Sequence, residues 1–329
     1  MRAVAIVEQE PAGGYEIQDL PEPSIGPREL LIAVRAAALN RADMAQREGR
    51  YRQAATAADG PRIAGLEAAG EVTAVGPAVR RWRVGDRAMA MCSGGFAEYV
   101  AVDERLALPV PDRLDWAAAA ATPVALLTGH DAIVTRAGLR GGESVVVHGA
   151  GSAVGLMAVQ IARLRGARPL LATATSALRS SLIRGLGADE VLTDPESFLD
   201  AATERTEAGV DVAIDFVGAE YFAANVAALA VGGRLVSVGR LGGTRAEVDL
   251  DLFAAKNLTC FGVSFRTRSL ARWAEVTRRA AADLLPALAD GQLDPVLDRI
   301  LPLEQLQGAE ERMIANRHQG KIVLTLRQD

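Results

Sequence analysis

The stretch that decides the fold is Ser144-Val145-Val146-Val147-His148-Gly149-Ala150-Gly151-Ser152-Ala153-Val154-Gly155. Its first five residues form a short, mostly β-branched run that is typical of a buried strand, and a glycine-rich turn follows. The alanine-rich segment from about 154 to 165 favours a helix. Small residues between a strand and a helix leave backbone N–H groups free for a phosphate, and the positive helix end complements its charge.

The segments that follow this turn repeat the same alternation. Strand-like runs occur at 169–173, 190–193, 210–215 and 234–238, and a helix is expected at 177–186. Strands that alternate with helices indicate a parallel sheet covered on both faces. The turn is not a strict G-x-G-x-x-G, because Val154 precedes the last glycine. Inside a β-α-β unit, however, it favours a dinucleotide-binding turn over a plain tight turn.

The two ends of the chain have a different character. Short strands separated by proline and glycine turns are expected at 2–7, 30–36, 69–76, 82–90 and 96–102. Many short strands predict a small β-barrel or a strongly bent sheet. The last 60 or so residues add a helix at 270–289 and a strand at 320–326, which we expect to return to the first domain. The alanine-rich tract from 117 to 127 is interpreted as a packed helix end.

Composition excludes several classes of protein. The chain has 329 residues, half of them hydrophobic, and a net charge of −5, which argues against a nucleic-acid or acidic-membrane binder. Its two cysteines, Cys92 and Cys260, supply neither a disulfide framework nor a four-cysteine zinc site. No long uncharged apolar stretch predicts a membrane span, and the first residues do not resemble a signal peptide. We therefore expect a cytoplasmic protein.

The end of the strand at 169–173 distinguishes the two nicotinamide dinucleotides. An acidic residue there would bind the ribose hydroxyls of NAD, but this chain has none at that point. It has Thr173, Thr175, Ser176 and, in the first turn of the next helix, Arg179. Hydroxyl donors and an arginine suit the 2′-phosphate of NADPH. The alternative for Arg179 is a solvated helix residue.

Several short motifs occur in a specific order along the chain. They are Asn40-Arg41-Ala42-Asp43 with Gly49-Arg50-Tyr51, Gly65-Leu66-Glu67-Ala68-Ala69-Gly70-Glu71-Val72, Val84-Gly85-Asp86-Arg87, Gly94-Gly95-Phe96-Ala97-Glu98-Tyr99, Gly187-Ala188-Asp189 and Gly320-Lys321-Ile322-Val323-Leu324. Over essentially its full length, the chain resembles the zinc-independent medium-chain dehydrogenase/reductase superfamily, in its quinone oxidoreductase (zeta-crystallin-like) branch.

This resemblance implies an α/β fold with two domains. A Rossmann doubly wound parallel sheet, residues 124–261, would be inserted in a GroES-like β-rich catalytic domain made of residues 1–123 and 262–329. The resemblance also implies NADPH as cofactor, a small quinone or enone as substrate, and a homodimer. Neither a nucleic acid nor a membrane is an expected partner.

The resemblance also bears on metals. Zinc-dependent relatives place a cysteine near the position of Asn40 and a histidine in a Gly-His-Glu motif, which reads Gly65-Leu66-Glu67 here. Leucine cannot bind zinc, and His130, His148 and His318 do not have a metal-ligand spacing. We expect no metal, and we interpret His148 as an ordinary core or turn histidine.

The candidate catalytic residues are Tyr51, Asn40 and Asp43. By resemblance, Asn40 lies near the nicotinamide ribose and the substrate, and Tyr51 lines the pocket. Tyr51 is either a hydrogen-bond or proton donor to the substrate oxygen or only a pocket-wall aromatic. Asp43 either orients a neighbouring arginine or asparagine or is a simple turn residue. The candidate cofactor-binding residues are Asn40, Thr128, Gly149, Ser152, Ala153, Val154, Gly155, Thr173, Thr175, Ser176, Arg179, Gly218, Gly239, Leu241, Ser264, Phe265, Arg266 and His318.

Two positions depart from the family pattern. Ser152-Ala153 replaces a usual pair of glycines, and both residues are small enough to leave room for a phosphate. Asp194 stands where relatives often carry a Tyr, Arg or Lys, and an acidic residue there weakens the preference for NADP slightly.

Three functions remain open at this point. The first is an NADPH-dependent reductase that transfers hydride to quinones or α,β-unsaturated carbonyls without metal. The second is a biosynthetic enoyl reductase or cyclase of the same fold, with a larger acyl or polyketide substrate. The third is a non-catalytic NADPH-binding protein. The first two share the cofactor turn, so the sequence barely separates them.

Overall fold

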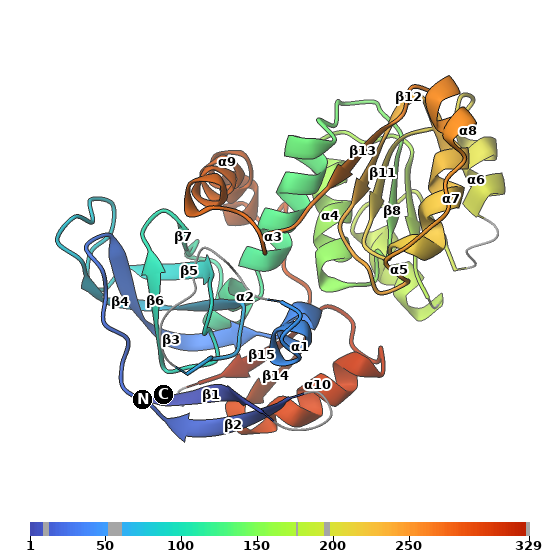
Figure 1. Cartoon of the computed structure of the whole chain (residues 1–329). Helices are drawn as coiled ribbons and strands as arrows, with labels where there is room; N and C mark the ends of the chain where they lie inside the picture. The colour runs from blue at the N-terminus through green and yellow to red at the C-terminus, as the bar shows by residue number, and fades with distance from the viewer. Residues whose placement is uncertain (9–12, 52–60, 176, 194–197, 327–329) are drawn as a thin grey trace. The chain divides into compact units, whose positions relative to one another are not determined.

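The computed structural model describes residues 1–8, 13–51, 61–175, 177–193 and 198–326. The chain forms two compact units (Figure 1). Unit 1 comprises residues 1–124, 265–290 and 295–329, and unit 2 comprises 125–264 and 291–294. The boundaries between the units follow residues 124, 264, 290 and 294, whereas the sequence predicted two, after 123 and 261. In the described part of the chain, no helix is long and apolar enough to span a bilayer.

Unit 1 is built on a seven-stranded sheet with the order β14-β15-β3-β4-β5-β7, and β6 also pairs with β3. The strands of this unit are β1 (Arg2–Val7), β2 (Gly14–Asp19), β3 (Glu29–Ala38), β4 (Glu67–Val75), β5 (Arg87–Met91), β6 (Tyr99–Asp103), β7 (Ala107–Pro109), β14 (Leu297–Pro302) and β15 (Lys321–Thr325). The C-terminal strand β15 pairs antiparallel with β3, which confirms the predicted return of the chain to the first domain.

The long strand β3 organises this sheet, and one glycine allows β4 to approach it closely. A Cβ atom on Gly70 would lie 2.0 Å from the carbonyl oxygen of Ala33. Only glycine permits that approach. Because β3 is antiparallel to both β4 and β15, the end of β3 lies beside the starts of its two neighbours.

The helices of unit 1 are α1 (Arg41–Arg47), α2 (Trp116–Ala120), α9 (Leu270–Ala289) and α10 (Leu306–Ile314). The bounds of α9 agree with the prediction. The alanine-rich tract at 117–127 is not one helix end but two helices, because α3 (Pro123–His130) begins at its proline. Proline is well tolerated in a first helical turn, where its missing N–H is not needed.

Unit 2 has a six-stranded sheet in which every pairing is parallel, with the order β10-β9-β8-β11-β12-β13. Its strands are β8 (Val145–His148), β9 (Leu170–Thr173), β10 (Glu190–Leu192), β11 (Val210–Asp215), β12 (Leu229–Ser237) and β13 (Thr259–Gly262). Its helices are α4 (Ala153–Leu164), α5 (Ala177–Gly185), α6 (Phe198–Arg205), α7 (Ala219–Ala228) and α8 (Leu250–Ala255), with α3 and a π-helical turn at Asp131–Arg136 before them. Helices lie on both faces of this sheet (Figure 1), as predicted for a doubly wound fold.

The core of unit 2 explains why its central strands are rich in β-branched and aliphatic residues. All four residues of β8 are buried, and so are all four of β9. Val146, Leu171, Ala213 and Leu235, from four neighbouring strands, pack in one apolar cluster with Phe198 of α6. A strand covered on both faces must be apolar on both, so its sequence shows a continuous run and not an alternation.

Candidate functional site

The glycine turn of unit 2 connects β8 to α4 and is held by the hydroxyl of Ser152. This hydroxyl donates to the Gly149 carbonyl at 2.9 Å and accepts from the Gly155 N–H at 3.1 Å. Ser152 therefore caps the helix, and its hydrogen is used inside the turn. A Cβ atom on Gly155 would lie 2.4 Å from the Gly149 oxygen, so only glycine fits there. Ala153 and Val154 lie in the first turn of α4, where backbone N–H groups have no acceptors within the helix.

Thr173, at the end of β9, anchors the start of the turn. Its hydroxyl accepts from the Gly149 N–H at 3.2 Å, and its carbonyl accepts from the Ala150 N–H at 2.9 Å. The same hydroxyl lies 3.2 Å from Nδ1 of His148, and Nε2 of His148 lies 2.7 Å from Oδ1 of Asn225. Burial lowers the pKa of His148 to about 4, so its ring is neutral at pH 7.

Arg179 lies directly beside the turn. A Cβ atom on Gly151 would meet Cδ of Arg179 at 2.7 Å, and Nη1 of Arg179 donates to the Thr175 hydroxyl at 3.3 Å. The structure thus brings together Arg179, the Thr175 hydroxyl and the glycine turn. Ser176 and Asp194 lie outside the described residues.

The remaining predicted residues of unit 2 lie mainly at the carboxyl ends of strands. The backbones of Gly218 and Gly239 approach each other, because a Cβ atom on Gly218 would lie 3.1 Å from the Gly239 oxygen. Asp215 stabilises this edge by accepting from the Val217 and Gly218 N–H groups at 2.7 and 2.9 Å. Burial raises the pKa of the Asp215 carboxyl. Three other predicted residues are placed as follows: Leu241 is 70% exposed after β12, Thr128 is buried on α3, and Ser264 follows β13.

Unit 1 contains a second buried polar cluster, made of Asn40, Glu67 and Lys321. Nζ of Lys321 donates to Oδ1 of Asn40 at 2.5 Å and forms an ion pair with Glu67. Nδ2 of Asn40 donates to Oε1 of Glu67 at 2.9 Å and to the carbonyl of Ala38 at 3.2 Å. The topology explains the cluster, since Asn40 follows β3 while Glu67 and Lys321 begin its two neighbours, β4 and β15.

These bonds define what Asn40 can offer to a ligand. Both hydrogens of its carboxamide are already donated, to Ala38 and to Glu67. Its oxygen accepts a hydrogen bond from Lys321, and in the capping box of α1 the Asn40 side chain also faces the backbone N–H of Asp43. In this arrangement Asn40 is an acceptor for a hydroxyl group and not a donor to a carbonyl.

Asp43 completes the cluster on the first turn of α1. One of its oxygens accepts from the Asn40 backbone N–H at 2.6 Å, and the residue is fully buried. Burial raises the pKa of Asp43 to about 8, so the carboxyl carries a proton at pH 7. Asp43 therefore supports the backbone of Asn40 with no net charge.

Arg266 reaches the backbone next to Tyr51, although the two residues are far apart in the sequence. Tyr51 follows α1, is half-buried, and donates its N–H to the Ala45 carbonyl at 2.9 Å. Nη1 of Arg266 donates to the carbonyl of Arg50, the residue before Tyr51, at 3.1 Å. Phe265 packs against Trp273 with ring centroids 5.8 Å apart, and His318 is buried ahead of β15.

Comparison with known proteins places these features in a family. Residues 26–112 match the model of the alcohol dehydrogenase GroES-like domain, and residues 153–282 match the model of the zinc-binding dehydrogenase domain. Human quinone oxidoreductase is 30% identical over 335 residues, which cover 99% of this chain and 98% of that protein. The chain belongs to the quinone oxidoreductase branch of the medium-chain dehydrogenase/reductase superfamily. It is thus an oxidoreductase of that superfamily, as the sequence predicted.

Two further relatives are informative for this quinone oxidoreductase family member. The quinone oxidoreductase of Thermus thermophilus, solved alone and with NADPH, has a TM-score of 0.84 and 33% identity over 99% of this chain and 100% of its own. Polyketide synthase GfsB of Streptomyces halstedii is 35% identical over 299 residues, or 91% of this chain. The chain spans only 5% of the length of GfsB.

The name of one matching domain implies zinc, and the residues of this family member do not fit it. Leu66 has no metal-binding atom, and the ammonium group of Lys321 already pairs with Glu67. A divalent cation at Glu67 would face that buried ammonium, and like charges in a buried site repel strongly. Within the described ranges, no group of three His, Cys, Asp or Glu residues could hold a metal ion.

Sequence reasoning missed three residues of these clusters: Glu67, Lys321 and Asn225. Lys321 carried a usable signal, because the chain has only two lysines and one of them begins an apolar strand. A lysine is seldom fully buried unless it is paired, so its position between Gly320 and Ile322 pointed to a buried partner. Glu67 and Asn225 carried no comparable local signal.

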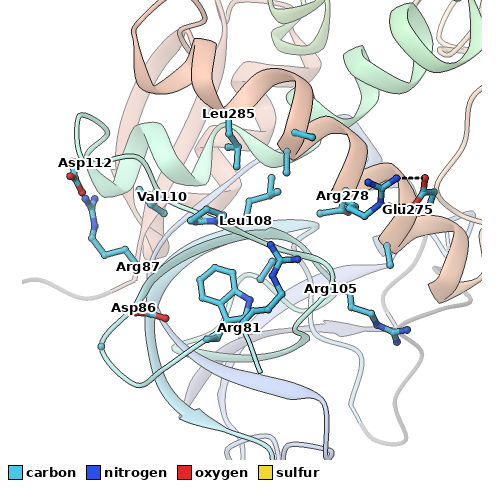
Figure 2. Close-up of a pocket in the computed structure, with 18 of the residues that line it drawn as sticks. Arg81, Asp86, Arg87, Arg105, Leu108, Val110, Asp112, Glu275, Arg278 and Leu285 are labelled. Carbon is cyan, nitrogen blue, oxygen red and sulfur yellow. Dashed lines mark hydrogen bonds and ion pairs between the residues drawn. The ribbon is translucent and has the colours of Figure 1, made fainter. Parts of the chain in front are cut away.

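A separate groove of about 960 Å³ lies in unit 1 between α9 and β7 (Figure 2). Leu108 and Val110 lie on the strand side and Leu285 on the helix side. Its charged walls contain an Arg278–Glu275 ion pair at 2.7 Å. None of the predicted site residues lines this groove, so it is not part of the candidate site.

Proposed function

We propose that the protein is an NADPH-dependent reductase that transfers hydride to quinones or α,β-unsaturated carbonyls without a metal ion. The observation that carries the cofactor choice is the position of the Arg179 side chain beside Gly151 of the glycine turn. The neighbouring Thr175 hydroxyl adds a second hydrogen-bonding group, and no carboxylate stands at the end of β9 to repel a 2′-phosphate. The NADPH complex of the Thermus relative supports the same choice.

When bound, the nicotinamide would supply the hydride from its C4 atom. The oxygen of the acceptor gains negative charge as hydride arrives, and it then needs a hydrogen-bond donor. We assign that donor role to the phenol of Tyr51. We assign to Asn40 the acceptance of a ribose hydroxyl by its carboxamide oxygen, since its hydrogens are used by Ala38 and Glu67.

The proposal does not require a metal. The buried ammonium of Lys321 supplies the fixed positive charge of the cluster, and Asn40 and Glu67 hold it in place. Asp43, protonated at pH 7, supports Asn40 without adding a negative charge that would attract a cation.

A second candidate is a biosynthetic enoyl reductase or cyclase of the same fold with a larger acyl substrate. The 35% identity to the polyketide synthase GfsB favours it. It is separated from the first candidate by substrate size. An enoyl thioester reduced at least tenfold faster than small quinones, measured as kcat/KM, would favour the biosynthetic role.

The reductase proposal is tested with purified protein, NADPH and 1,2-naphthoquinone or 9,10-phenanthrenequinone, followed at 340 nm. We expect NADPH oxidation that depends on both the protein and the quinone. Tight NADPH binding without oxidation by any quinone, enone or enoyl thioester would identify a non-catalytic NADPH-binding protein instead.

The cofactor choice is tested by Arg179→Ala. Loss of a charged partner for the 2′-phosphate should weaken NADPH binding by about 10-fold or more and leave NADH binding nearly unchanged. Equal or tighter binding of NADH by the unaltered protein would contradict this role of Arg179.

The donor role of Tyr51 is tested by Tyr51→Phe, which removes only the hydroxyl. Loss of a general acid commonly costs about 10²-fold or more, so kcat for an enone should fall strongly. Unchanged turnover would leave Tyr51 as a pocket-wall aromatic.

We also propose that the protein acts on small-molecule substrates and that it forms a homodimer. In support, β13 is an end strand of the sheet of unit 2, and its residues Thr259, Cys260 and Gly262 are exposed. An open strand edge can pair with a second copy. Light scattering of the purified protein would test this, since a mass close to 34.6 kDa would identify a monomer.

A further inference from the structure

A chain of hydrogen bonds connects the phosphate turn to the interior of unit 2. It runs from the N–H of Gly149 to the hydroxyl of Thr173, then to the ring of His148 and finally to the carboxamide of Asn225. We infer that His148 and Thr173 are positioning residues for the cofactor, because they fix the orientation of Gly149 at the start of the turn. This inference rests on the proposed nicotinamide dinucleotide.

The direction of each bond follows from the chemistry of its partners. Oδ1 of Asn225 can only accept, so Nε2 of His148 carries the ring hydrogen. Nδ1 of the neutral ring must then accept, and the Thr173 hydroxyl donates to it. That hydroxyl accepts in turn from the Gly149 N–H. Every link thus has one donor and one acceptor.

The ring of His148 is itself held in one orientation. It stacks on Tyr221 with ring centroids 4.2 Å apart and meets the edge of Phe198 at 4.7 Å. His148 and Asn225 are completely buried. The helices α6 and α7 therefore fix the ring, and the ring fixes the Thr173 hydroxyl.

The anchored end of the turn determines where its free N–H groups lie. Gly149 has a φ of +68°, and both its N–H and that of Ala150 are bonded to Thr173. The N–H groups of Ala153 and Val154, in the first turn of α4, are the ones a helix leaves for an anion. If Gly149 loses its anchor, these groups shift relative to the pyrophosphate while the adenosine site at Arg179 is not altered directly.

The experiment compares Thr173→Val with Thr173→Ser. Valine keeps the shape but removes the hydroxyl, so we expect NADPH to bind about 10-fold more weakly. Serine keeps the hydroxyl and should restore binding to within about threefold. Adenosine 2′-monophosphate, which has no pyrophosphate, should bind equally well to all three proteins in an NMR titration.

A matched control separates positioning from general loss of stability. Thr206 is also a buried threonine of unit 2, and its hydroxyl donates to the Ala202 carbonyl at 2.6 Å. Thr206→Val should lower the melting temperature but leave NADPH affinity unchanged. His148→Phe should weaken NADPH binding as Thr173→Val does. The double variant His148→Phe/Thr173→Val should bind NADPH no more weakly than either single variant, because the two residues belong to one chain of hydrogen bonds.

The outcomes are distinguishable from those that test the proposed function. Unchanged NADPH affinity in Thr173→Val, equal loss for adenosine 2′-monophosphate, or failure of Thr173→Ser to restore binding would overturn the positioning role. If NADPH binds as expected but no acceptor is reduced, the proposed reaction fails and the positioning role stands. If the unaltered protein prefers NADH, the comparison is made with NADH and adenosine.

Discussion

The two buried polar clusters of this protein differ in charge. The cluster of unit 1 keeps an ion pair between Lys321 and Glu67, whereas the network of unit 2, built on His148 and Thr173, is neutral. Both lie at strand ends next to predicted site residues. Burial acts on both in the same sense, favouring uncharged forms, since it raises the pKa of Asp43 and lowers that of His148.

The difference teaches what each cluster can contribute. A charged group survives burial only with a well-placed partner, so the ion pair of unit 1 is sensitive to the loss of either member. A neutral network has a smaller electrostatic cost but requires every donor to find an acceptor. We therefore expect substitutions in the ion pair of unit 1 to affect mainly stability and fixed charge, and those in the hydrogen-bond network of unit 2 to affect mainly the position of the turn.

The largest expected effect is that of Lys321→Met. It leaves the carboxylate of Glu67 buried without its cation, which should cost about 3–5 kcal/mol of unfolding free energy. The measurement is urea unfolding followed by circular dichroism. The matched double variant Glu67→Gln/Lys321→Met removes both charges and should recover at least half of the loss. A double variant as unstable as the single one would show that the charge of Glu67 is not the cause.

The next effect is a pH dependence in unit 1. Because the folded pKa of Asp43, about 8, lies above its ordinary value of 3.8, the folded state holds a proton that the unfolded state has released. This contribution to stability is fully present below about pH 4 and is lost as pH rises toward 8, by up to about 1.4 kcal/mol per pH unit. Asp43→Asn should remove that loss. Identical pH–stability curves for Asp43→Asn and the unaltered protein would contradict it.

Unit 2 should show the opposite slope. The folded pKa of His148, about 4, lies below its ordinary value of 6.5, so the unfolded state binds the extra proton. Stability is fully present above about pH 6.5 and falls as pH drops toward 4, again by up to about 1.4 kcal/mol per pH unit. His148→Gln should abolish this acid sensitivity. Between about pH 4 and 6.5, the pH slopes of the unfolding free energy that arise from Asp43 and from His148 have opposite signs in the unaltered protein. Asp43→Asn should therefore reveal the slope due to His148, and His148→Gln the slope due to Asp43.

The smallest expected effect is that of metal removal. The ammonium group of Lys321 already pairs with Glu67, where a metal ion would otherwise bind. Dialysis against EDTA should therefore leave the reductase rate within experimental error of that of the untreated protein. Metal analysis before dialysis should find well under one zinc per chain. Loss of activity that added zinc restores would overturn the metal-free mechanism.

Much of unit 2 could be predicted because its signals are local. The apolar run of β8, the turn after it and the start of α4 were all expected where they occur, and so was the place of Arg179 in the first turn of the next helix, α5. The strands β2, β7, β13 and β14 were missed. Gly14–Asp19 has only one β-branched residue and Thr259–Gly262 is short and exposed, so neither has the pattern of a half-buried strand.

The candidate site was predictable in part for the same reason. Asn40, Asp43 and Tyr51 were proposed from motifs that lie close together in sequence. Glu67 and Lys321 were not, because they are 254 residues apart and meet only through the sheet. The hydrogen bonds of Asn40 could not be predicted from the sequence either. Only the structure shows that both hydrogens of its carboxamide are already donated, so that it can only accept a hydrogen bond from a ligand.

The sequence by itself determined the alternation of strands and helices and the position of the glycine turn between β8 and α4. It also showed that no acidic residue stands at the end of β9. These features could be predicted because backbone periodicity and turn chemistry are local properties. Only the tertiary structure decided which charges meet. The antiparallel register of β15, β3 and β4 brings Lys321 to Asn40 and Glu67, and parallel pairing of β8 with β9 brings His148 to Thr173. Such pairings depend on sheet register, which no local pattern encodes.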